Sequence, residues 1–361
     1  MSAKYILEQC IIGPRVQMSI SEARYKELAH ARRVLSDALA FEQRYELLLG
    51  NFLAMELALT EICLRAKVEP RLGYLNSAEM LDKANRHVVN FLTAMRGYAD
   101  QVLSDFKCLV MEAGFGAVAK SELGKAYDRS KDYRFMCALR NHVQHKATAI
   151  HGFVLDDDGV GGSNSWVETV KFAADSARLK SDRNFKRSIL LEQPDKIDIR
   201  RRARGSVQEV GIVHRTLRRV SEDQVDLARS LVESAIRDYQ GASATSALGL
   251  SARHVGNVDA DVPLFLDWDD VRLQLVEKNS ALPQLWPHRT HREPRVEQII
   301  ALREEVKQTQ AQAAAMVFVS EECWKDYEEG LPMPEGLFYL YQLRVERHPT
   351  HALLLLKDLN K

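Results

Sequence analysis

The sequence has few cysteines, and each of them stands alone. Five cysteines occur in 361 residues, and no two of them form a CxxC pair. A zinc ribbon needs closely spaced cysteines, and a disulfide framework normally needs an even number of them, so both kinds of protein are disfavoured. Isolated cysteines are typical of proteins from a reducing compartment.

The sequence also has little that would direct it to a membrane. Residues 1–5 lack the combination of a positive charge and a following apolar run that marks a signal peptide. The most apolar stretch, residues 51–64, is interrupted by Glu56 and Glu61 and is shorter than the ~18 residues of a membrane span. We therefore expect a cytoplasmic protein without a membrane partner.

Several catalytic motifs are absent as well. The chain contains no Walker A loop, no GxGxxG after a strand, no GxSxG and no HExxH. Nucleotide hydrolysis, dinucleotide binding, serine hydrolase chemistry and zinc proteolysis are disfavoured accordingly. Fifty basic residues balance fifty acidic ones, so the net charge gives no argument for a polyanionic partner.

Helical spacing of apolar residues dominates the first 150 residues. The capping pattern Ser19-x-x-Glu22 predicts the start of a long helix, and Asn76-x-x-Glu79 predicts the start of a second. Shorter helices are expected from Ser121, after a glycine loop at residues 114–116, and over residues 133–150. Four or so helices with short connections favour an up-down bundle.

The pattern changes after residue 150. Two strand-like runs, residues 150–155 and 166–172, flank turn residues and predict a β-hairpin. A helix near residues 182–191 and an alternating run over residues 196–200 come next. A further helix is expected to end at Tyr239, and Gly211 leaves its start open between Ser206 and Ser221.

Composition predicts where the chain divides. Residues 241–262 are rich in Ala, Ser and Gly, which is typical of a linker. It would separate a helical domain of residues 1–240 from a C-terminal, mostly helical region of residues 263–361. Within that region helices are expected at residues 267–278 and 295–317, with two shorter elements around Trp324 and Leu340. No motif indicates what this region does.

Reactive side chains are concentrated in residues 140–145. On a helix with ~100° per residue, the apolar side chains of this segment gather on one stripe, and Asn141 and His145 fall on the opposite side. Arg140 and His142 lie on the two edges of the stripe. We expect the core margin to hold His142 as a structural residue, because an arginine at an edge extends its head into water more easily.

The residue types of this segment suit phosphate chemistry. Histidine transfers protons near neutral pH, and arginine binds phosphate with two parallel hydrogen bonds. Together they favour phosphodiester cleavage without a metal or another cofactor. A simple solvated helix face is the alternative. A metal site formed by His142, His145 and His151 is disfavoured, because no carboxylate or cysteine lies at a suitable spacing.

Arg140-Asn141-x3-His145 resembles the Arg-x4–6-His motif of the HEPN superfamily, in which a polar residue, often Asn, follows the arginine. The resemblance covers residues from about 20 to about 240. It implies a mainly α fold: a HEPN-like helical bundle, here with a small β-hairpin insertion and a C-terminal helical region. It also implies a metal-independent endoribonuclease that acts as a homodimer, with the two motif helices lining a shared cleft.

The resemblance assigns a role to each motif residue. His145 would act as general base or acid at the ribose 2′-OH, Arg140 would stabilise charge on the phosphorus oxygens, and Asn141 would orient the pair. A protein of this kind would be a toxin or an antiphage-defence effector in a bacterial cytoplasm. An inhibitory partner, such as an antitoxin, would hold it in check.

A basic stretch follows the predicted hairpin. Residues 178–219 contain thirteen Lys/Arg and five Asp/Glu. Such a surface can bind the phosphates of RNA. The alternative is an ordinary face whose charges pair with acidic neighbours. The arginines predicted to bind RNA are Arg200, Arg201, Arg202, Arg204 and Arg215.

Two classes of function stay open at this point. One is an endoribonuclease of HEPN type that cleaves RNA by attack of the ribose 2′-OH. The other is a non-catalytic HEPN-like helical protein that binds RNA, a nucleotide or a partner protein. A pure helical scaffold is a third possibility, and it would neither cleave RNA nor bind it in a salt-dependent way.

Overall fold

A computed structural model describes residues 4–11, 16–68, 74–110, 114–145, 148–155, 170–182, 185–243, 246–283, 294, 296–331 and 333–347. The chain divides into two compact units. Unit 1 comprises residues 1–156 and 167–283, and unit 2 comprises residues 157–166 and 284–361. Both units are mainly helical, which confirms the predicted fold class at that level.

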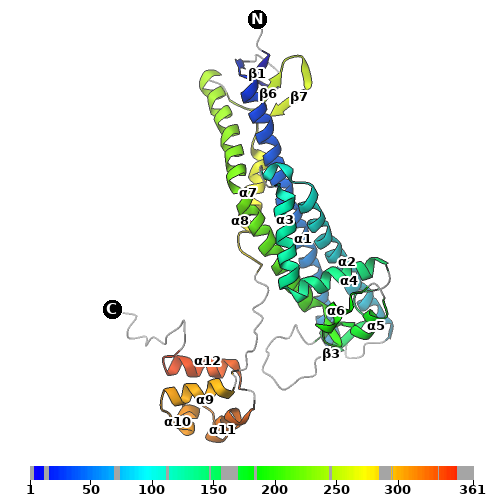
Figure 1. The fold of residues 1–361 in the computed structure, drawn as a ribbon, viewed down its shortest axis with the longest axis vertical. Coiled ribbons are helices and arrows are strands. Elements are labelled where there is room, and N and C mark those ends of the chain that lie inside the picture. Colours follow the sequence, from blue (N-terminus) through cyan, green and yellow to red (C-terminus); the bar gives the residue numbers. More distant parts are fainter. Residues whose placement is uncertain are drawn as a thin grey trace. The chain divides into compact units, whose positions relative to one another are not determined.

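Three long helices form the frame of unit 1 (Figure 1). Helix α1 (Glu22–Val68) packs along α2 (Tyr74–Ser104) and α7 (Ile199–Ser243). The shorter helices α3 (Phe115–Arg129) and α4 (Lys131–His145) contact both α2 and α7. Apolar side chains at helical spacing fill the space between these helices, among them Leu28, Leu35, Phe41, Met55, Phe91, Phe135, Leu139 and Leu217.

Two small antiparallel sheets lie at opposite ends of unit 1 (Figure 1). One has the order β2 (Gln17–Ser19), β1 (Tyr5–Gln9), β6 (Leu250–His254) and β7 (Asn257–Pro263). The other has the order β3 (Gly152–Leu155), β4 (Val170–Asp175) and β5 (Lys196–Asp198). In the second sheet Phe153 lies opposite Phe172, which confirms the predicted hairpin pairing, and the alternating run at residues 196–198 adds a third strand.

Strands β6 and β7 show that the predicted linker at residues 241–262 is wrong. Strand β6 pairs with β1 along its whole length, from Tyr5 opposite His254 to Gln9 opposite Leu250. The small residues Ser251 and Ala252 are buried in this strand, so residues 250–254 belong to the folded part of unit 1 and not to a flexible connection. Unit 1 therefore extends to residue 283 and not to residue 240.

Three glycines lie inside helices whose starts differ from the predicted ones. Helix α3 begins at Phe115 and not at Ser121, and a Cβ at Gly116 in its first turn would overlap with the carbonyl oxygen of Leu103. Helix α7 continues through Gly205 and Gly211, where a Cβ would meet the Asp132 carboxylate and the Tyr45 hydroxyl. A glycine weakens a helix by itself, but here each one permits a close approach between helices.

Two helix ends also differ from their predicted positions. Helix α1 begins at Glu22, and the Ser21 hydroxyl accepts a hydrogen bond from the Arg24 N–H at 3.1 Å. Ser21 is therefore the N-cap, whereas the predicted Ser19 lies in β2. Helix α4 ends at His145 and not at Ile150.

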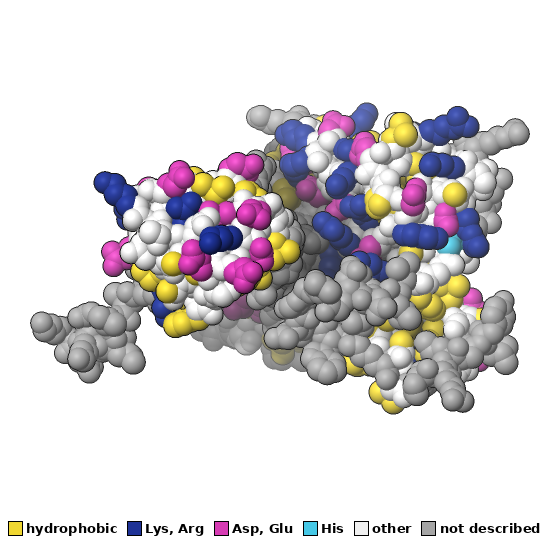
Figure 2. Space-filling view, turned by 90° about the horizontal axis from the view of Figure 1, so that it is seen from below, with side chains coloured by type: hydrophobic (Ala, Val, Ile, Leu, Met, Phe, Trp, Pro, Cys, Tyr) yellow, Lys and Arg dark blue, Asp and Glu magenta, His cyan; other side chains and the backbone are white. Residues whose placement is uncertain are grey.

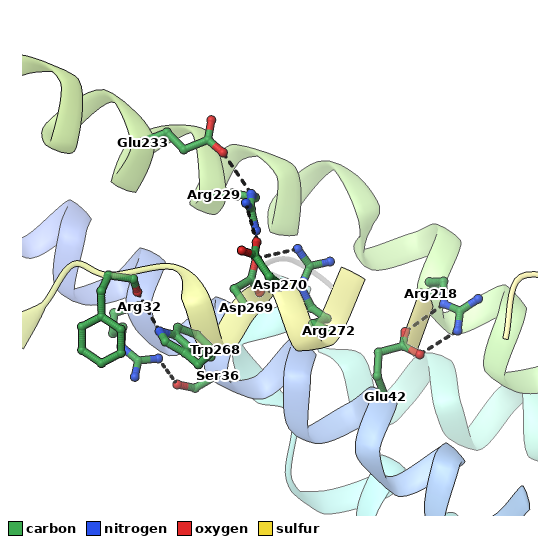
Figure 3. A network of polar contacts seen from close by, with 11 residues as sticks. Arg32, Ser36, Glu42, Arg218, Arg229, Glu233, Trp268, Asp269, Asp270 and Arg272 are labelled. Carbon is green, nitrogen blue, oxygen red and sulfur yellow. Dashed lines mark hydrogen bonds and ion pairs between the residues drawn. The ribbon is translucent and has the colours of Figure 1, made fainter. Parts of the chain in front are cut away.

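Helix α8 (Asp267–Lys278) has the predicted bounds and is fixed to α7 by buried charges (Figure 3). Asp269 is fully buried and accepts hydrogen bonds from Arg272 at 2.6 and 2.9 Å and from Arg229 of α7 at 2.6 Å. On the other side of α8, the Arg32 guanidinium of α1 lies 3.7 Å from the centre of the Trp268 ring. Helix α8 is thus held by both α1 and α7.

A buried histidine occupies the middle of unit 1. The His214 ring lies between the rings of Phe41 and Tyr45, at centroid distances of 4.2 and 4.0 Å. Its Nδ1 is 3.1 Å from the Tyr98 hydroxyl, and its Nε2 is 3.1 Å from a carboxylate oxygen of Glu42. The residue is only 1% exposed, so it belongs to the core and cannot reach a substrate.

One part of α1 is apolar enough to raise the question of a membrane. It contains a stretch that could cross a membrane by length and composition, and about a third of that stretch is buried within the protein. The core helix of a soluble protein passes the same test. In α1 the carboxylate of Glu56 forms ion pairs with Arg200 and Arg204 of α7.

Unit 2 is a small helical domain. It contains α9 (Val296–Glu305), α10 (Gln310–Met316), α11 (Glu321–Glu329) and α12 (Glu335–Arg344). The single helix predicted over residues 295–317 is divided, because Lys307 has a φ of 54° and Thr309 starts α10 with a capping box. The fully buried Trp324 lies in the core of this unit.

Candidate functional site

The residues predicted to be reactive lie in the C-terminal half of α4. Asn141 is exposed and Arg140 is half-buried, and Arg140 Nη1 donates a hydrogen bond to Asn141 Oδ1 at 3.3 Å. His145 is the last residue of α4, and its side chain lies outside the described part of the structure. The structure therefore brings Arg140 and Asn141 together.

Ion pairs fix the first half of α4. Near its start, the Asp132 carboxylate binds the guanidinium of Arg202 in α7. Two residues later, Arg134 donates to the carbonyl oxygens of Tyr127 and Asp128 at the end of α3, both at 2.7 Å. The same guanidinium binds Glu192 at 2.7 Å. Arg134 thus joins α4 both to the end of α3 and to the residue that follows α6 (Arg187–Leu191).

A buried His–Asp pair fixes the second half of α4. The Nδ1 of His142 lies 2.7 Å from the carboxylate of Asp182, and both side chains are about 5% exposed or less. The edge of the His142 ring packs against Phe185. This burial agrees with the expectation that His142 is a structural residue.

The chain after α4 is held by an asparagine of α2. The Asn85 side-chain amide accepts from the Ile150 N–H at 2.8 Å and donates to the Ile150 carbonyl oxygen at 3.1 Å. Ile150 is buried as predicted, although it lies beyond the helix that the prediction placed it in. The position of α4 is therefore defined at both ends.

A groove of about 410 Å³ runs beside α4, with walls from α2, α3, α4 and the start of α6. Most of its lining is apolar. Its exposed polar side chains are Arg96, Asn141 and Lys186. The remaining lining residues are Ala99, Leu103, Leu123, Gly124, Tyr127, Tyr133, Cys137, Ala138 and Ile189.

The ionisable groups of the groove are neutral or positive, apart from one neighbouring carboxylate. Arg96 binds Asp100, one turn further along α2, at 2.9 and 2.7 Å. Burial raises the pKa of Tyr133 well above its usual value, and burial raises the pKa of the Cys137 thiol to about 11. Both groups are protonated at neutral pH, so Cys137 is not a thiolate nucleophile.

The end of unit 1 near this groove is basic. Arg178 and Lys180 of α5 (Ser176–Lys180) are exposed, as are Lys186 and Arg187 at the start of α6. None of these four side chains forms an ion pair with a carboxylate among the described residues. Figure 2 looks at this end of unit 1 and shows Lys and Arg side chains gathered on it. Such a surface attracts polyanions.

Three of the five arginines predicted to bind RNA have partners inside the fold. Arg200 donates to Glu56 and Thr60 at 2.7 Å, and Arg204 binds both oxygens of Glu56 at 2.7 and 2.9 Å. Arg202 binds Asp132. For these three, the alternative of charges paired with acidic neighbours holds.

The other two predicted arginines are exposed, and the groove residues were missed. Arg201 and Arg215 are both exposed on α7. Sequence reasoning did not select Arg96 and Lys186 of the groove. Lys186 belongs to the basic stretch and so carried some signal, whereas nothing in the sequence connects Arg96 of α2 with α4.

Neither the described chain nor known proteins add another candidate. Among the described residues, no group of three or more His, Cys, Asp and Glu is arranged to hold a metal ion. No protein-family model, no curated protein and no solved structure matches this chain. The groove, the Arg140–Asn141 pair and the basic surface are therefore the features from which a function can be inferred.

Proposed function

We propose that this protein acts on RNA and is a metal-independent endoribonuclease of HEPN type, with its site on α4. One observation carries the proposal. The Arg140–Asn141 pair, which resembles the HEPN motif, lies on a rigidly held helix, and Asn141 lines a groove that also contains Arg96 and Lys186. Phosphate groups are bound well by arginine, and a basic surface next to the groove would attract an RNA strand.

The proposed reaction needs only groups of the protein and of the RNA. The ribose 2′-oxygen forms a bond to the adjacent phosphorus while the bond to the 5′-oxygen of the next nucleotide breaks, which leaves a 2′,3′-cyclic phosphate. His145 takes the proton from the 2′-OH or gives a proton to the leaving oxygen. Arg140 stabilises the negative charge on the phosphorus oxygens, and Asn141 orients Arg140 through their hydrogen bond.

The same resemblance supports the biological part of the proposal. Residues from about 20 to about 240 would form the HEPN-like bundle, and two copies of the chain would form a homodimer with a shared cleft. The protein would be a toxin or an antiphage-defence effector in the cytoplasm, and an inhibitory partner would restrain it. Expression of the active protein alone would then arrest bacterial growth.

The test is cleavage of total RNA by the purified protein, with and without EDTA. We expect cleavage in EDTA, and we expect Arg140→Ala and His145→Ala each to lower the rate by about 100-fold or more, the typical effect of removing a group that stabilises or transfers charge in the transition state. Gln144→Ala, which changes an exposed residue of the same helix, is the matched control. Full cleavage by both motif variants would refute the proposed mechanism, as would loss of cleavage in EDTA.

His142→Ala should behave differently from the motif variants. It removes the hydrogen bond between the His142 ring and the buried Asp182 carboxylate, and the loss of a polar contact to a buried charge destabilises a fold. We expect a lower unfolding midpoint in urea, together with cleavage by the remaining folded protein. A His142→Ala protein that is stable but does not cleave RNA would show that His142 takes part in the reaction and is not only structural.

The second candidate function is RNA binding without cleavage. The observation that favours it is the basic surface, which does not depend on the motif. In that case the purified protein would bind RNA in a salt-dependent way and leave it intact, and Arg140→Ala would affect neither growth nor the RNA.

Salt dependence also separates the exposed cations from the paired ones. We expect the double variant Lys186→Ala/Arg187→Ala to bind RNA more weakly and to show a smaller slope of log affinity against log salt, by ~0.7 for each phosphate of a single strand that the protein no longer neutralises. Arg204→Ala should keep the slope, because its guanidinium is bound to Glu56, and should instead lower stability. An equal decrease of the slope in both proteins would show that Arg204 leaves Glu56 to bind RNA.

A further inference from the structure

We propose that the groove beside α4 is a subsite for a single nucleotide, with its base against the apolar walls and its phosphate on the exposed cations. This inference rests on the proposed action on RNA and specifies which part of the substrate the groove holds. It is carried by the size of the groove, by the chemistry of its walls and by its position next to Arg140.

The size of the groove suits a small ligand. Its volume of about 410 Å³ falls within the ~300–1,000 Å³ that is typical of small-molecule sites and near the lower end of that range. A nucleotide fits this space, whereas a double helix or a folded protein segment is too large to enter it. A strand that lies along the basic surface would therefore place one nucleotide in the groove.

The walls of the groove suit a flat ring. Leu103, Leu123 and Ile189 present apolar side chains, and the half-buried Tyr127 adds an aromatic one. Bases stack on aromatic side chains and pack on apolar ones whatever their sequence. The exposed amide of Asn141 can donate to and accept from the edge of a base, so it is the groove's means of discriminating between bases.

The charges of the groove suit a phosphate. Lys186 is exposed and has no carboxylate partner among the described residues, whereas the charge of Arg96 is partly balanced by Asp100. Tyr133 and Cys137 add no negative charge at neutral pH. Arg140 is hydrogen-bonded to Asn141. When a nucleotide contacts Asn141, the phosphodiester that joins it to the next nucleotide therefore lies near Arg140, the proposed catalytic arginine.

A glycine in the wall makes the proposal testable. Gly124 of α3 lines the groove, and a Cβ built there would meet no atom within 4 Å, so a larger side chain can be placed at the groove wall without displacing the fold. Gly97 of α2 is the matched control. It is also helical and also has no atom within 4 Å of a built Cβ, but it does not line the groove.

The experiment measures binding of nucleoside monophosphates to the full-length protein by NMR titration, with ribose 5-phosphate and inorganic phosphate as probes for the phosphate alone. We expect the nucleotides to bind at least tenfold more tightly than either probe. Gly124→Leu should weaken nucleotide binding at least tenfold, and Gly97→Leu should not change it. Lys186→Ala should weaken binding of the nucleoside monophosphates more than that of the corresponding nucleosides, because the nucleosides carry no phosphate.

Three outcomes would overturn the inference: unchanged binding by Gly124→Leu, equal binding of inorganic phosphate and nucleotide, or no nucleotide binding at millimolar concentration. The RNA cleavage assay distinguishes its failure from that of the proposed function. If Gly124→Leu binds nucleotides and cleaves RNA like the unchanged protein, only the subsite is refuted. If nucleotides bind in the groove but the unchanged protein cleaves no RNA, the subsite stands and the nuclease proposal fails.

Discussion

Replacing Glu42 with alanine is expected to destabilise unit 1 by about 3–5 kcal/mol, the usual effect of breaking a buried ion pair from one side. The Glu42 carboxylate is 3% exposed and accepts hydrogen bonds from Arg218 at 2.8 and 2.6 Å, as Figure 3 shows. It is also the partner of the His214 Nε2. Without the Glu42 carboxylate, the Arg218 guanidinium loses its counter-ion, and the Nε2 of the buried His214 ring loses its hydrogen-bond acceptor. Urea unfolding at pH 7 measures the change.

Glu46 of the same helix provides the control. Its carboxylate also has two partners, Lys278 and Asn279, but its side chain is 30% exposed. Exposed ion pairs contribute ~1 kcal/mol or less, so Glu46→Ala should lower stability by no more than that. Equal losses of unfolding free energy in the two variants would show that the buried Glu42 contacts stabilise the fold no more than the exposed Glu46 contacts do.

The same network gives the sign of a pH dependence. Burial by itself would raise the pKa of Glu42, but the hydrogen bonds from His214 and Arg218 lower it from 4.5 to about 2. Burial lowers the pKa of His214 below 6.5, although Glu42 acts in the opposite direction. The unfolded chain therefore takes up protons on His214 below pH 6.5 and on Glu42 below pH 4.5, before the folded protein does.

Stability should accordingly begin to fall as the pH drops below 6.5, and it should fall further between pH 4.5 and 2. The difference in unfolding free energy between the unchanged protein and Glu42→Gln should shrink over the second interval, because the variant has no carboxyl group to protonate there. Urea unfolding at pH 7, 5.5, 4 and 3 tests this. If the difference in unfolding free energy between the two proteins instead grew toward low pH, the pKa of Glu42 would not be lowered in the folded protein.

The features that the sequence predicted correctly depend on local patterns. Helix α8 has the predicted bounds, and the acidic residues of its first turn are a local signal of a helix start. The antiparallel pairing of β3 with β4 agrees with the hairpin predicted from two strand-like runs on either side of turn residues, although the predicted turn and residues 166–169 lie outside the described residues. On α4, helical periodicity alone was enough to place Asn141 in solvent and His142 at the core.

The features that were missed depend on partners far away in the sequence. Arg200 and Glu56 are 144 residues apart, so a run of arginines looked like a free basic surface when its charges were already paired. Strand β6 could not be distinguished from a linker, because its partner β1 lies at the other end of unit 1's sequence. The groove needs side chains from four helices, and no single stretch of sequence contains its outline.

Trp324→Ala is expected to unfold unit 2 and to leave unit 1 folded. The Trp324 ring is fully buried, lies 4.8 Å from the Tyr341 ring and donates from its Nε1 to Glu328 at 2.8 Å. Replacing a buried tryptophan with alanine typically costs about 3–5 kcal/mol. A domain as small as unit 2 is seldom more stable than ~3–5 kcal/mol, so this loss is comparable with its whole stability.

Glu328 makes the substitution more damaging than the lost volume alone. Its carboxylate is bound by Arg303 at 2.6 and 3.1 Å and by Gln310 at 2.8 Å, and the indole completes this set and shields it from water. Hydrogen exchange measures the two units separately: peptides from residues 296–347 should lose protection, while those from α1, α2 and α7 keep it. Phe318→Ala is the control, because Phe318 belongs to the same unit but is 75% exposed. Loss of protection in both units of the Trp324 variant would mean that they unfold together, and so that the boundary near residue 283 does not separate two folding units.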